Sequence, residues 1–282
     1  GRGVFGGGAT TTGTQVDFVN ISTLGNALDF GVLNEKTEYM ASCSSSTRGL
    51  WGGGRNPTSI NSIQYLTIAS TGNAQDFGDL TTARLSVGGC SSSTRGIFAG
   101  GEPAPYFNVI DYVQISTIGN ALDFGDLTSS RGPSNGLSSS TRGIFGGGAT
   151  PSIVKTIDSI TISSTGNAVK FGDLITSSEV YCSSNSTRGI FFHSEGTISY
   201  ITLSSFGNSV DFGDCTVSRF GASSCSSSTR GIFAGGRTPT IQNVIDYVTI
   251  ASTGNAQDFG DLTFARHALA ACSDSHGGLG GF

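Results

Sequence analysis

The chain has 282 residues, of which only 12% are charged, and its formal net charge is −5. Its fifteen lysines and arginines are spread along the sequence, so a basic nucleic-acid surface is not expected. No apolar run approaches 18 residues, so membrane insertion is not expected either. Apolar residues make up 36% of the chain and recur periodically, which favours a folded core over disorder.

The first predicted element is a short strand at residues 3–5, within the segment Arg-Gly-Val-Phe-Gly. Variants of this segment, in which an arginine and a glycine precede two apolar residues, return at steps of 46, 47, 47, 46 and 42 residues. A period in this range indicates a repeat architecture. The arginines that mark the six copies are Arg2, Arg48, Arg95, Arg142, Arg188 and Arg230.

Each complete unit predicts four short strands. In the unit that starts at Arg84, residues 85–90 and 96–99 form two strands around a Ser-Ser-Ser-Thr-Arg turn. After a Gly-Gly pair and a variable loop, residues 109–115 alternate polar and apolar side chains, as a half-buried strand does. A turn with Gly and Asn, which tolerate positive φ, leads to a fourth strand at 123–127. No segment of helical period and useful length occurs in the sequence.

The two ends of the chain predict a closed ring. The chain starts at the second strand of a unit and finishes with an additional first strand at 268–272. This C-terminal strand can pair with the N-terminal blade and remove both open sheet edges. The expected fold is therefore all-β: a six-bladed β-propeller with four-stranded antiparallel blades. Residues 1–275 form this single domain, and the Gly-rich residues 276–282 are expected to be a tail or linker.

Six cysteines are present, and their positions argue against disulfides. Five align to one place in the repeat, just before the serine-rich turn, where Leu137 stands in the remaining unit. Equivalent atoms of neighbouring blades are expected to lie too far apart for a bridge, so buried free thiols are predicted. A bridge that involves Cys215, or metal binding, is the alternative. The five aligned cysteines are Cys43, Cys90, Cys182, Cys225 and Cys272.

The order of motifs resembles the Kelch repeat along the whole chain. Ile97-Phe98-Ala99-Gly100-Gly101 matches its apolar-Gly-Gly element, and Asp111-Tyr112 falls near its tyrosine. Phe124 stands where that family has tryptophan, and Arg131 stands at its arginine that leads into the next blade. The resemblance implies a Kelch-like propeller in which the first strand of each blade lies innermost.

One segment carries a narrower resemblance. The segment from Tyr247 to Leu262 is similar in sequence to Kelch-type repeats in tail-associated proteins of bacterial viruses. It reads Tyr-Val-Thr-Ile-Ala-Ser-Thr-Gly-Asn-Ala-Gln-Asp-Phe-Gly-Asp-Leu. This implies a virion or tail-fibre protein that recognises the host surface, with other virion proteins and a host-surface glycan or protein as partners. The alternatives are a secreted or cell-surface carbohydrate-binding propeller and an intracellular Kelch-type adaptor that holds a peptide.

Arginines enter the first strand in four of the six units, and Thr37 takes that place in another. The Kelch resemblance implies that these side chains approach the mouth of the central channel. The loops at 55–61, 102–108, 149–155 and 237–243 differ while the scaffold around them does not, and loops on a rigid frame commonly carry binding. The candidate ligand-binding residues are Arg84, Arg131, Arg219 and Arg266, together with Arg55 and Arg237, which open two of these loops.

Two repeated features have both a ligand-binding and a structural interpretation. The turn arginines could hold an acidic ligand in a ring, or each could bond carbonyls or an aspartate in its own or the next blade. The repeated Asn-Ala-x-Asp-Phe-Gly-Asp could offer oxygens to Ca²⁺, or could simply build a turn; Lys170 replaces its first aspartate in one unit. The fifth unit has a very short loop at 193–196, which predicts a notch in the ring.

Catalysis finds little support in the sequence. It contains three histidines, none of them in a nucleophile motif, and no Gly-x-Ser-x-Gly elbow. We therefore expect a non-enzymatic protein without a cofactor or a metal site. A propeller enzyme, such as a glycosidase or lyase, is the alternative.

Overall fold

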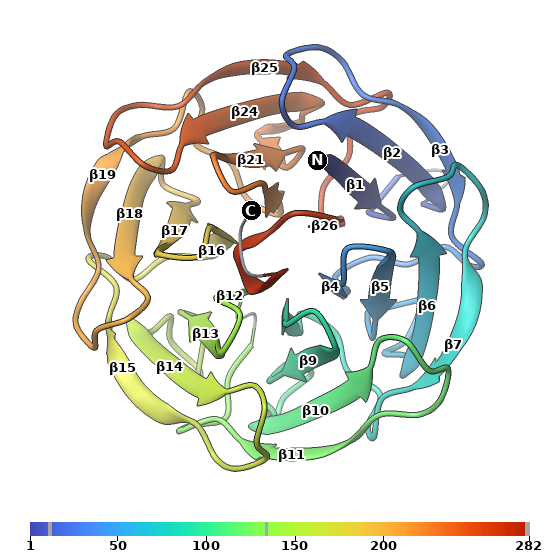
Figure 1. Cartoon of the computed structure of the whole chain (residues 1–282), viewed down its shortest axis with the longest axis vertical. Helices are drawn as coiled ribbons and strands as arrows, with labels where there is room; N and C mark the ends of the chain where they lie inside the picture. Colours follow the sequence, from blue (N-terminus) through green and yellow to red (C-terminus); the bar gives the residue numbers. More distant parts are fainter. Residues whose placement is uncertain (11–12, 133–134, 280–282) are drawn as a thin grey trace.

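The computed structural model describes residues 1–10, 13–132 and 135–279. These residues form six blades around a central axis, and every blade is a four-stranded antiparallel sheet (Figure 1). In each blade the first strand lies nearest the axis and the fourth lies at the rim (Figure 1). The predicted all-β, six-bladed propeller is therefore confirmed.

Blade 1 combines strands from both ends of the chain, because its innermost strand comes from the C-terminal end. Blade 1 consists of β26 (Ala270–Ser273), β1 (Arg2–Gly6), β2 (Gln15–Asn20) and β3 (Leu28–Val32). Blade 2 consists of β4 (Ala41–Ser44), β5 (Arg48–Gly52), β6 (Ser62–Thr67) and β7 (Gln75–Asp79). Blade 3 consists of β8 (Gly88–Ser91), β9 (Arg95–Ala99), β10 (Val109–Gln114) and β11 (Leu122–Asp126).

Blades 4 to 6 are continuous in sequence, like blades 2 and 3, and blade 6 carries a small additional hairpin. Blade 4 consists of β12 (Asn135–Ser138), β13 (Arg142–Gly146), β14 (Thr156–Thr161) and β15 (Val169–Asp173). Blade 5 consists of β16 (Val180–Ser184), β17 (Arg188–His193), β18 (Thr197–Thr202) and β19 (Val210–Asp214). Blade 6 consists of β20 (Ser223–Ser226), β21 (Arg230–Ala234), β24 (Val244–Thr249) and β25 (Gln257–Asp261), with the hairpin β22 (Arg237–Thr238) and β23 (Thr240–Ile241).

The hydrophobic core lies between neighbouring blades rather than in one central cluster. In one such layer Cys43 and Leu50 of blade 2 share a buried cluster with Phe98 and Val113 of blade 3. Phe98 is fully buried because its ring packs against Gly52 of blade 2, where an added Cβ would lie 2.8 Å from the ring. Each blade therefore depends on its neighbours to bury its two apolar faces.

Ring closure and a covered rim remove the open edges of the sheets. β26 pairs with β1, with Val4 opposite Cys272, as the chain ends predict. At the rim, the turn of one blade lies along the fourth strand of the previous blade: Ala121 N–H donates to the carbonyl of Asp79 at 2.8 Å, and Asn120 Oδ1 accepts the N–H of Asp79 at 3.1 Å. Paired or covered edges protect a β protein from edge-to-edge association.

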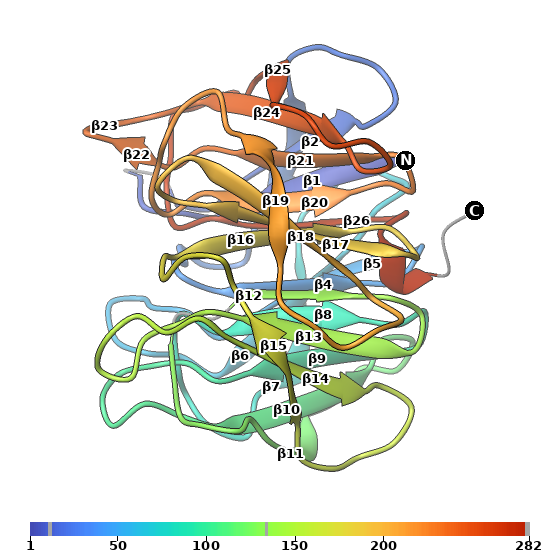
Figure 2. The ribbon, with the colours of Figure 1, turned by 90° about the vertical axis from the view of Figure 1, so that its left-hand side faces the viewer.

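The two ends of the ring differ, and Figure 2 shows both in profile. We call the end that carries the serine-rich turns and the C-terminal segment the turn face. The opposite end carries the linkers between blades and the variable loops, including β22 and β23, and we call it the loop face. The residues predicted as a tail include a short 3-10 helix, η1 (Gly277–Leu279), on the turn face; residues 280–282 lie outside the described residues.

The alignment of Cys182 with the other cysteines is wrong. Cys90 lies opposite Ile97 in its blade, and the residue in the same register in blade 5, opposite Ile190, is Ser183. Because side chains alternate along a strand, this slip of one residue turns Cys182 to the opposite side of the sheet. All six cysteines are free thiols, and five of them are buried.

Candidate functional site

The four arginines that enter the first strands do not reach the channel mouth, which corrects the expectation that they do. Each lies inside its own blade, at most 2% exposed, and forms an ion pair with an aspartate on the third strand. A guanidinium buried inside a blade in this way is not accessible to a ligand. The pairs are Arg84–Asp111 (3.1 Å), Arg131–Asp158 (2.8 Å), Arg219–Asp246 (2.7 Å) and Arg266–Asp17 (3.1 Å).

The aspartate partners escaped the sequence analysis, although the sequence contains a signal for them. Where the arginine is absent, the aspartate is absent too. In blade 2 Thr37 replaces the arginine and Gln64 the aspartate, and Gln64 Oε1 accepts the N–H of Asn34 at 2.8 Å. In blade 5 the buried His193 bridges two hydroxyls, with Nδ1 2.6 Å from Ser178 Oγ and Nε2 2.8 Å from Ser199 Oγ. Because the arginine and the aspartate are replaced together in these two blades, the two positions form one structural unit inside each blade.

The buried His193 predicts a specific loss of stability in acid. Burial lowers its pKa from 6.5 to about 4. Between pH 6.5 and 4 the unfolded chain therefore takes up a proton that the folded protein does not. Stability is complete above pH 6.5 and falls as the pH drops, by up to about 3 kcal/mol at pH 4 from this group.

The measurement is urea unfolding at a series of pH values for the wild type and for His193→Gln. We expect the wild type to lose about 3 kcal/mol more than the variant between pH 6.5 and 4, since the other titrating groups are common to both. Parallel stability curves for the two proteins would refute this role of His193.

The turn arginines connect neighbouring blades, so the contacts support their structural interpretation. Arg48 Nη1 donates to the carbonyl of Ile115 in the next blade at 3.0 Å, and its guanidinium lies 4.7 Å from the ring centre of Tyr65. The cation–π contact and the inter-blade bond together occupy the side chain. The other five arginines donate in the same way to the carbonyls of Ile68, Ile162, Leu203, Ile250 and Ile21.

The Asn-Ala-x-Asp-Phe-Gly-Asp turns also serve contacts between blades. The asparagine oxygen that could have bound Ca²⁺ accepts a backbone N–H of the previous blade, as Asn167 Oδ1 does from Asp126 at 3.0 Å. Among the described residues no group of three or more His, Cys, Asp or Glu side chains could hold a metal ion. These contacts favour turn chemistry over cation binding.

A ring of serine hydroxyls surrounds the channel near the turn face. Each hydroxyl donates to the backbone carbonyl of the equivalent serine in the previous blade at 2.5–2.8 Å, so the six bonds close a circle. The sequence signal for this ring is a serine directly after an aligned cysteine in four blades; in the other two, Ser138 follows Leu137 and Ser184 follows Ser183. Its members are Ser44, Ser91, Ser138, Ser184, Ser226 and Ser273.

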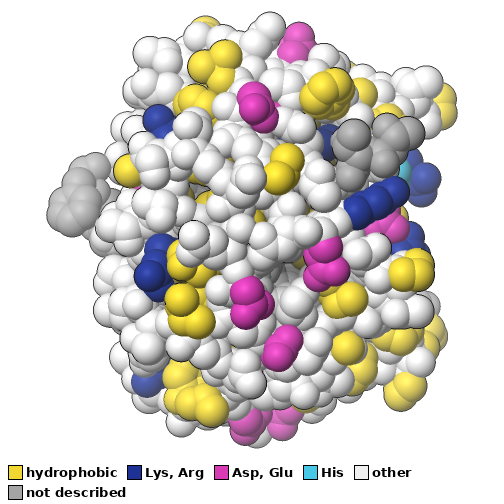
Figure 3. All heavy atoms as spheres, turned by 90° about the vertical axis from the view of Figure 1, so that its right-hand side faces the viewer, with side chains coloured by type: hydrophobic (Ala, Val, Ile, Leu, Met, Phe, Trp, Pro, Cys, Tyr) yellow, Lys and Arg dark blue, Asp and Glu magenta, His cyan; other side chains and the backbone are white. Residues whose placement is uncertain are grey.

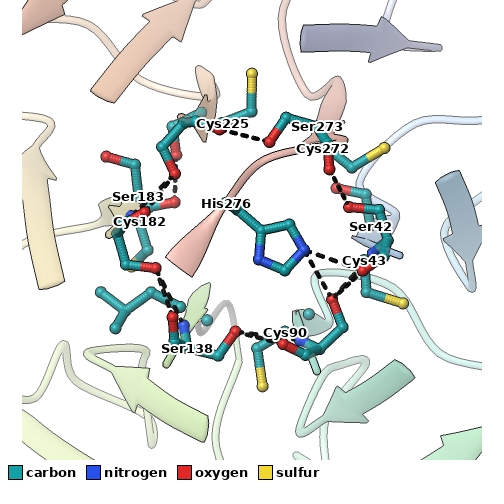
Figure 4. A pocket seen from close by; sticks show the side chains of 18 of the residues that line it. Ser42, Cys43, Cys90, Ser138, Cys182, Ser183, Cys225, Cys272, Ser273 and His276 are labelled. Atoms are coloured by element: carbon teal, nitrogen blue, oxygen red, sulfur yellow. Dashed lines mark hydrogen bonds between the residues drawn. The ribbon is translucent and has the colours of Figure 1, made fainter. Parts of the chain in front are cut away.

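His276 closes the channel at this end. Figure 4 shows its imidazole at the centre of the innermost strands, and Nε2 lies 3.0 Å from the carbonyl oxygen of Ser44. Its Nδ1 accepts the N–H of Gly278 at 3.0 Å, which leaves Nε2 as the protonated nitrogen. The cavity that remains has a volume of about 60 Å³, enough for a few water molecules and too small for a sugar or a peptide. A second cavity, of about 50 Å³, is lined by the same innermost strands together with Met40 and Leu269. Neither cavity has room for a sugar or a peptide, so the outer surfaces are the better candidates for ligand binding.

The loop face carries a ring of six unlike residue pairs around the other mouth. In each blade a linker residue lies beside the first residue of the loop after the second strand, joined by a backbone bridge or, in blade 5, by a 2.9 Å bond from Ser194 N–H to the carbonyl of Glu179. The side chains of this pair thus differ from blade to blade, although the backbone arrangement recurs. In blade order the pairs are His267 with Ala9, Glu38 with Arg55, Leu85 with Glu102, Gly132 with Ala149, Glu179 with Ser194, and Phe220 with Arg237.

The mouth on the loop face is held by strained backbone. Tyr39, Ser86 and Ala268 all have positive φ, between 54° and 57°, although none is glycine. Bonds between blades fix them: Ser86 N–H donates to Tyr39 O at 2.7 Å, and Tyr39 N–H donates to Ala268 O at 2.9 Å. Such conformations persist only where surrounding contacts impose them, and they concentrate at functional sites.

The two loop arginines among the candidates do lie on the loop face, in different states. Arg55 Nε donates to Glu38 Oε1 at 2.8 Å, and its guanidinium lies 5.3 Å from the ring centre of Tyr39. Arg237 begins the β22–β23 hairpin and is exposed. Of all the predicted site residues, these two are the ones that the structure places on an accessible surface.

Comparison with known proteins adds no family. The sequence matches no protein-family model, and no curated protein is significantly similar to it. Among the described residues, no helix has the length and apolar character needed to cross a membrane.

The geometry as a whole fits a binding or structural role. The flank of the ring shows charged side chains scattered among uncharged ones (Figure 3). The turn face is occupied by repeated contacts between blades and by His276. The loop face alone combines a rigid frame with a different side-chain pair on each blade. A rigid ring with a varied surface can recognise a shape and a charge pattern.

Proposed function

We propose that the protein is a non-enzymatic binding propeller that recognises the surface of a host cell through its loop face, as a component of a bacterial-virus particle or its tail. The observation that carries the binding role is that the residue pair on the loop face differs on each blade while its backbone arrangement recurs. Selection for stability alone would favour similar pairs there, since each pair occupies the same backbone frame.

The particle assignment rests on the resemblance of the segment from Tyr247 to Leu262 to repeats of viral tail-associated proteins. Other virion proteins would hold the propeller, and a glycan or protein of the host surface would meet its loop face. A rigid, closed ring suits this task because presenting preformed loops lowers the entropic cost of binding.

Density-gradient fractionation of the source material, with peptide mass spectrometry of each fraction, tests the particle assignment. Peptides of this chain should band with intact particles in a constant ratio to a capsid protein. Peptides found only in soluble or cell-envelope fractions would exclude the virion and favour a secreted carbohydrate-binding propeller.

A further inference from the structure

Arg237 differs from every other arginine of the chain. Eleven of the twelve arginines donate from their side chains to a carbonyl or a carboxylate of the protein. Arg237 has bonds from its backbone, to Phe220 and Ile241, and among the described residues its guanidinium has no hydrogen bond, ion pair or ring contact. An exposed guanidinium without an internal partner retains all five donors for a ligand.

The residues beside Arg237 are apolar and exposed. The isolated bridge places Phe220 next to it, and the hairpin register places Ile241 opposite it. Phe220 is 51% exposed and Ile241 43% exposed, values that are high for side chains of this type. Arg237 therefore stands between two apolar side chains, on the two-stranded hairpin that blade 6 adds to its four strands.

The surface formed by Arg237, Phe220 and Ile241 borders His267 of blade 1 on one side and the short loop of blade 5 on the other. Gly221, which follows Phe220, packs against His267 of blade 1, where an added Cβ would lie 3.4 Å from the histidine Cβ. In neighbouring blade 5 the connection between β17 and β18 is only the turn from Ser194 to Gly196, which confirms the predicted short loop. The hairpin of blade 6 thus rises beside the shortest loop of the ring.

The acidic side chain of blade 5 on this side does not neutralise Arg237. Glu179 Oε1 accepts the O–H of Tyr181 at 2.7 Å, and among the described residues Glu179 and Arg237 interact only through their charges, without an ion pair. Burial raises the pKa of Glu179, while its hydrogen bonds and the charge of Arg237 lower it. The positive charge of Arg237 is thus available on a partly apolar surface.

We propose that Arg237, Phe220 and Ile241 form a subsite for a carboxylate-bearing sugar of an acidic glycan, an inference that rests on the loop-face recognition proposed above. The guanidinium fork matches a carboxylate with two parallel hydrogen bonds. The exposed phenyl ring of Phe220 offers its electron-rich face to the C–H groups of a sugar ring. A flat, open patch of this kind accommodates one residue of a long polymer without a deep pocket.

The test is calorimetric titration of the full chain with oligogalacturonides, which carry a carboxylate on every ring, and with their methyl esters. We expect the acid to bind and both the ester and Arg237→Ala to weaken binding by at least about tenfold, the loss of one charge-assisted pair. Lys170→Ala is the matched control, because it removes one positive charge from a residue on the flank, where Lys170 pairs with Asp173. It should change the affinity by less than about twofold.

Two further ligands make the assignment specific. Equal binding of dextran sulfate would overturn the preference for a carboxylate, and equal binding of polyglutamate would overturn the sugar. Equal affinity of wild type and Arg237→Ala for oligogalacturonide would overturn the subsite. Binding of intact host cells by the wild type separates the two proposals. If the wild type binds cells and Arg237→Ala does not weaken this binding, the subsite alone is wrong. If the wild type binds neither cells nor glycans, the proposed function is wrong.

Discussion

Replacing Arg131 by alanine is expected to lower the free energy of unfolding by about 3–5 kcal/mol, the loss typical of breaking a buried ion pair. Arg131 and Asp158 are both fully buried, with Nη1 2.8 Å from Oδ2. Without the guanidinium, Asp158 keeps only the N–H of Thr128 at 3.0 Å and its hydroxyl at 2.7 Å. A carboxylate then stays inside the blade with no compensating positive charge.

The chain itself supplies the control for this experiment. Arg131→Thr combined with Asp158→Gln reproduces the pair of blade 2, Thr37 and Gln64, and removes both charges together. We expect this double variant to recover at least half of the loss, as replacement of a whole buried pair usually costs less than removal of one partner. Equilibrium unfolding in urea measures all three proteins. A loss below about 1 kcal/mol for Arg131→Ala would contradict the structural role of the pair.

The architecture was predictable because it depends on spacing. The six recurring arginines indicated the number of blades, and the strand at 268–272 indicated how the ring closes. In the structure β26, Ala270–Ser273, takes that place. Both features are properties of the order of strands, so they can be derived without knowing any distance between blades.

The contacts between blades were not predictable in the same way. The bond from Ser91 Oγ to the carbonyl of Ser44, at 2.8 Å, exists because the innermost strands of adjacent blades approach closely around the axis. Nothing within one repeat specifies that approach, so the serines appeared to be residues of a turn. For the same reason Arg84 was expected near the channel, whereas its partner Asp111 lies 27 positions later on the third strand of the same blade.

The candidate site shows the same division. The variable loops indicated Arg55 and Arg237, since loops that differ on a constant scaffold stand out in a repeat. The distinction between them required the structure: Arg55 pairs with Glu38, while among the described residues the guanidinium of Arg237 has no hydrogen bond, ion pair or ring contact. The Cys182 misalignment arose because Cys182 stands six positions before Arg188, whereas Cys90 stands five positions before Arg95, so it is Ser183 that shares the register of Cys90.

Removal of β26 is expected to have the largest effect of any change to this protein. A chain that ends at Leu269 loses the partner of β1, the bond from Trp51 Nε1 to the carbonyl of Ala270 at 3.1 Å, and the buried Cys272. Several losses of this size together should lower the melting temperature by more than about 10 °C. The exposed edge of β1 should also recruit other chains, so size-exclusion chromatography should show oligomers or aggregates.

A chain that ends at Ser275 separates closure of the ring from closure of the channel. It keeps β26 and removes His276 and η1, so the serine ring and all six blades remain intact. We expect it to stay monodisperse, with a melting temperature within about 5 °C of the full chain, because the loss is confined to the contacts of His276 and η1 while the pairing of β26 with β1 is kept. If both truncations aggregate alike, the C-terminal segment and not the pairing of β26 with β1 would hold the ring closed. If neither truncated chain aggregates, the five remaining complete blades would be sufficient for stability, and the pairing of β26 with β1 would not be what holds the propeller together.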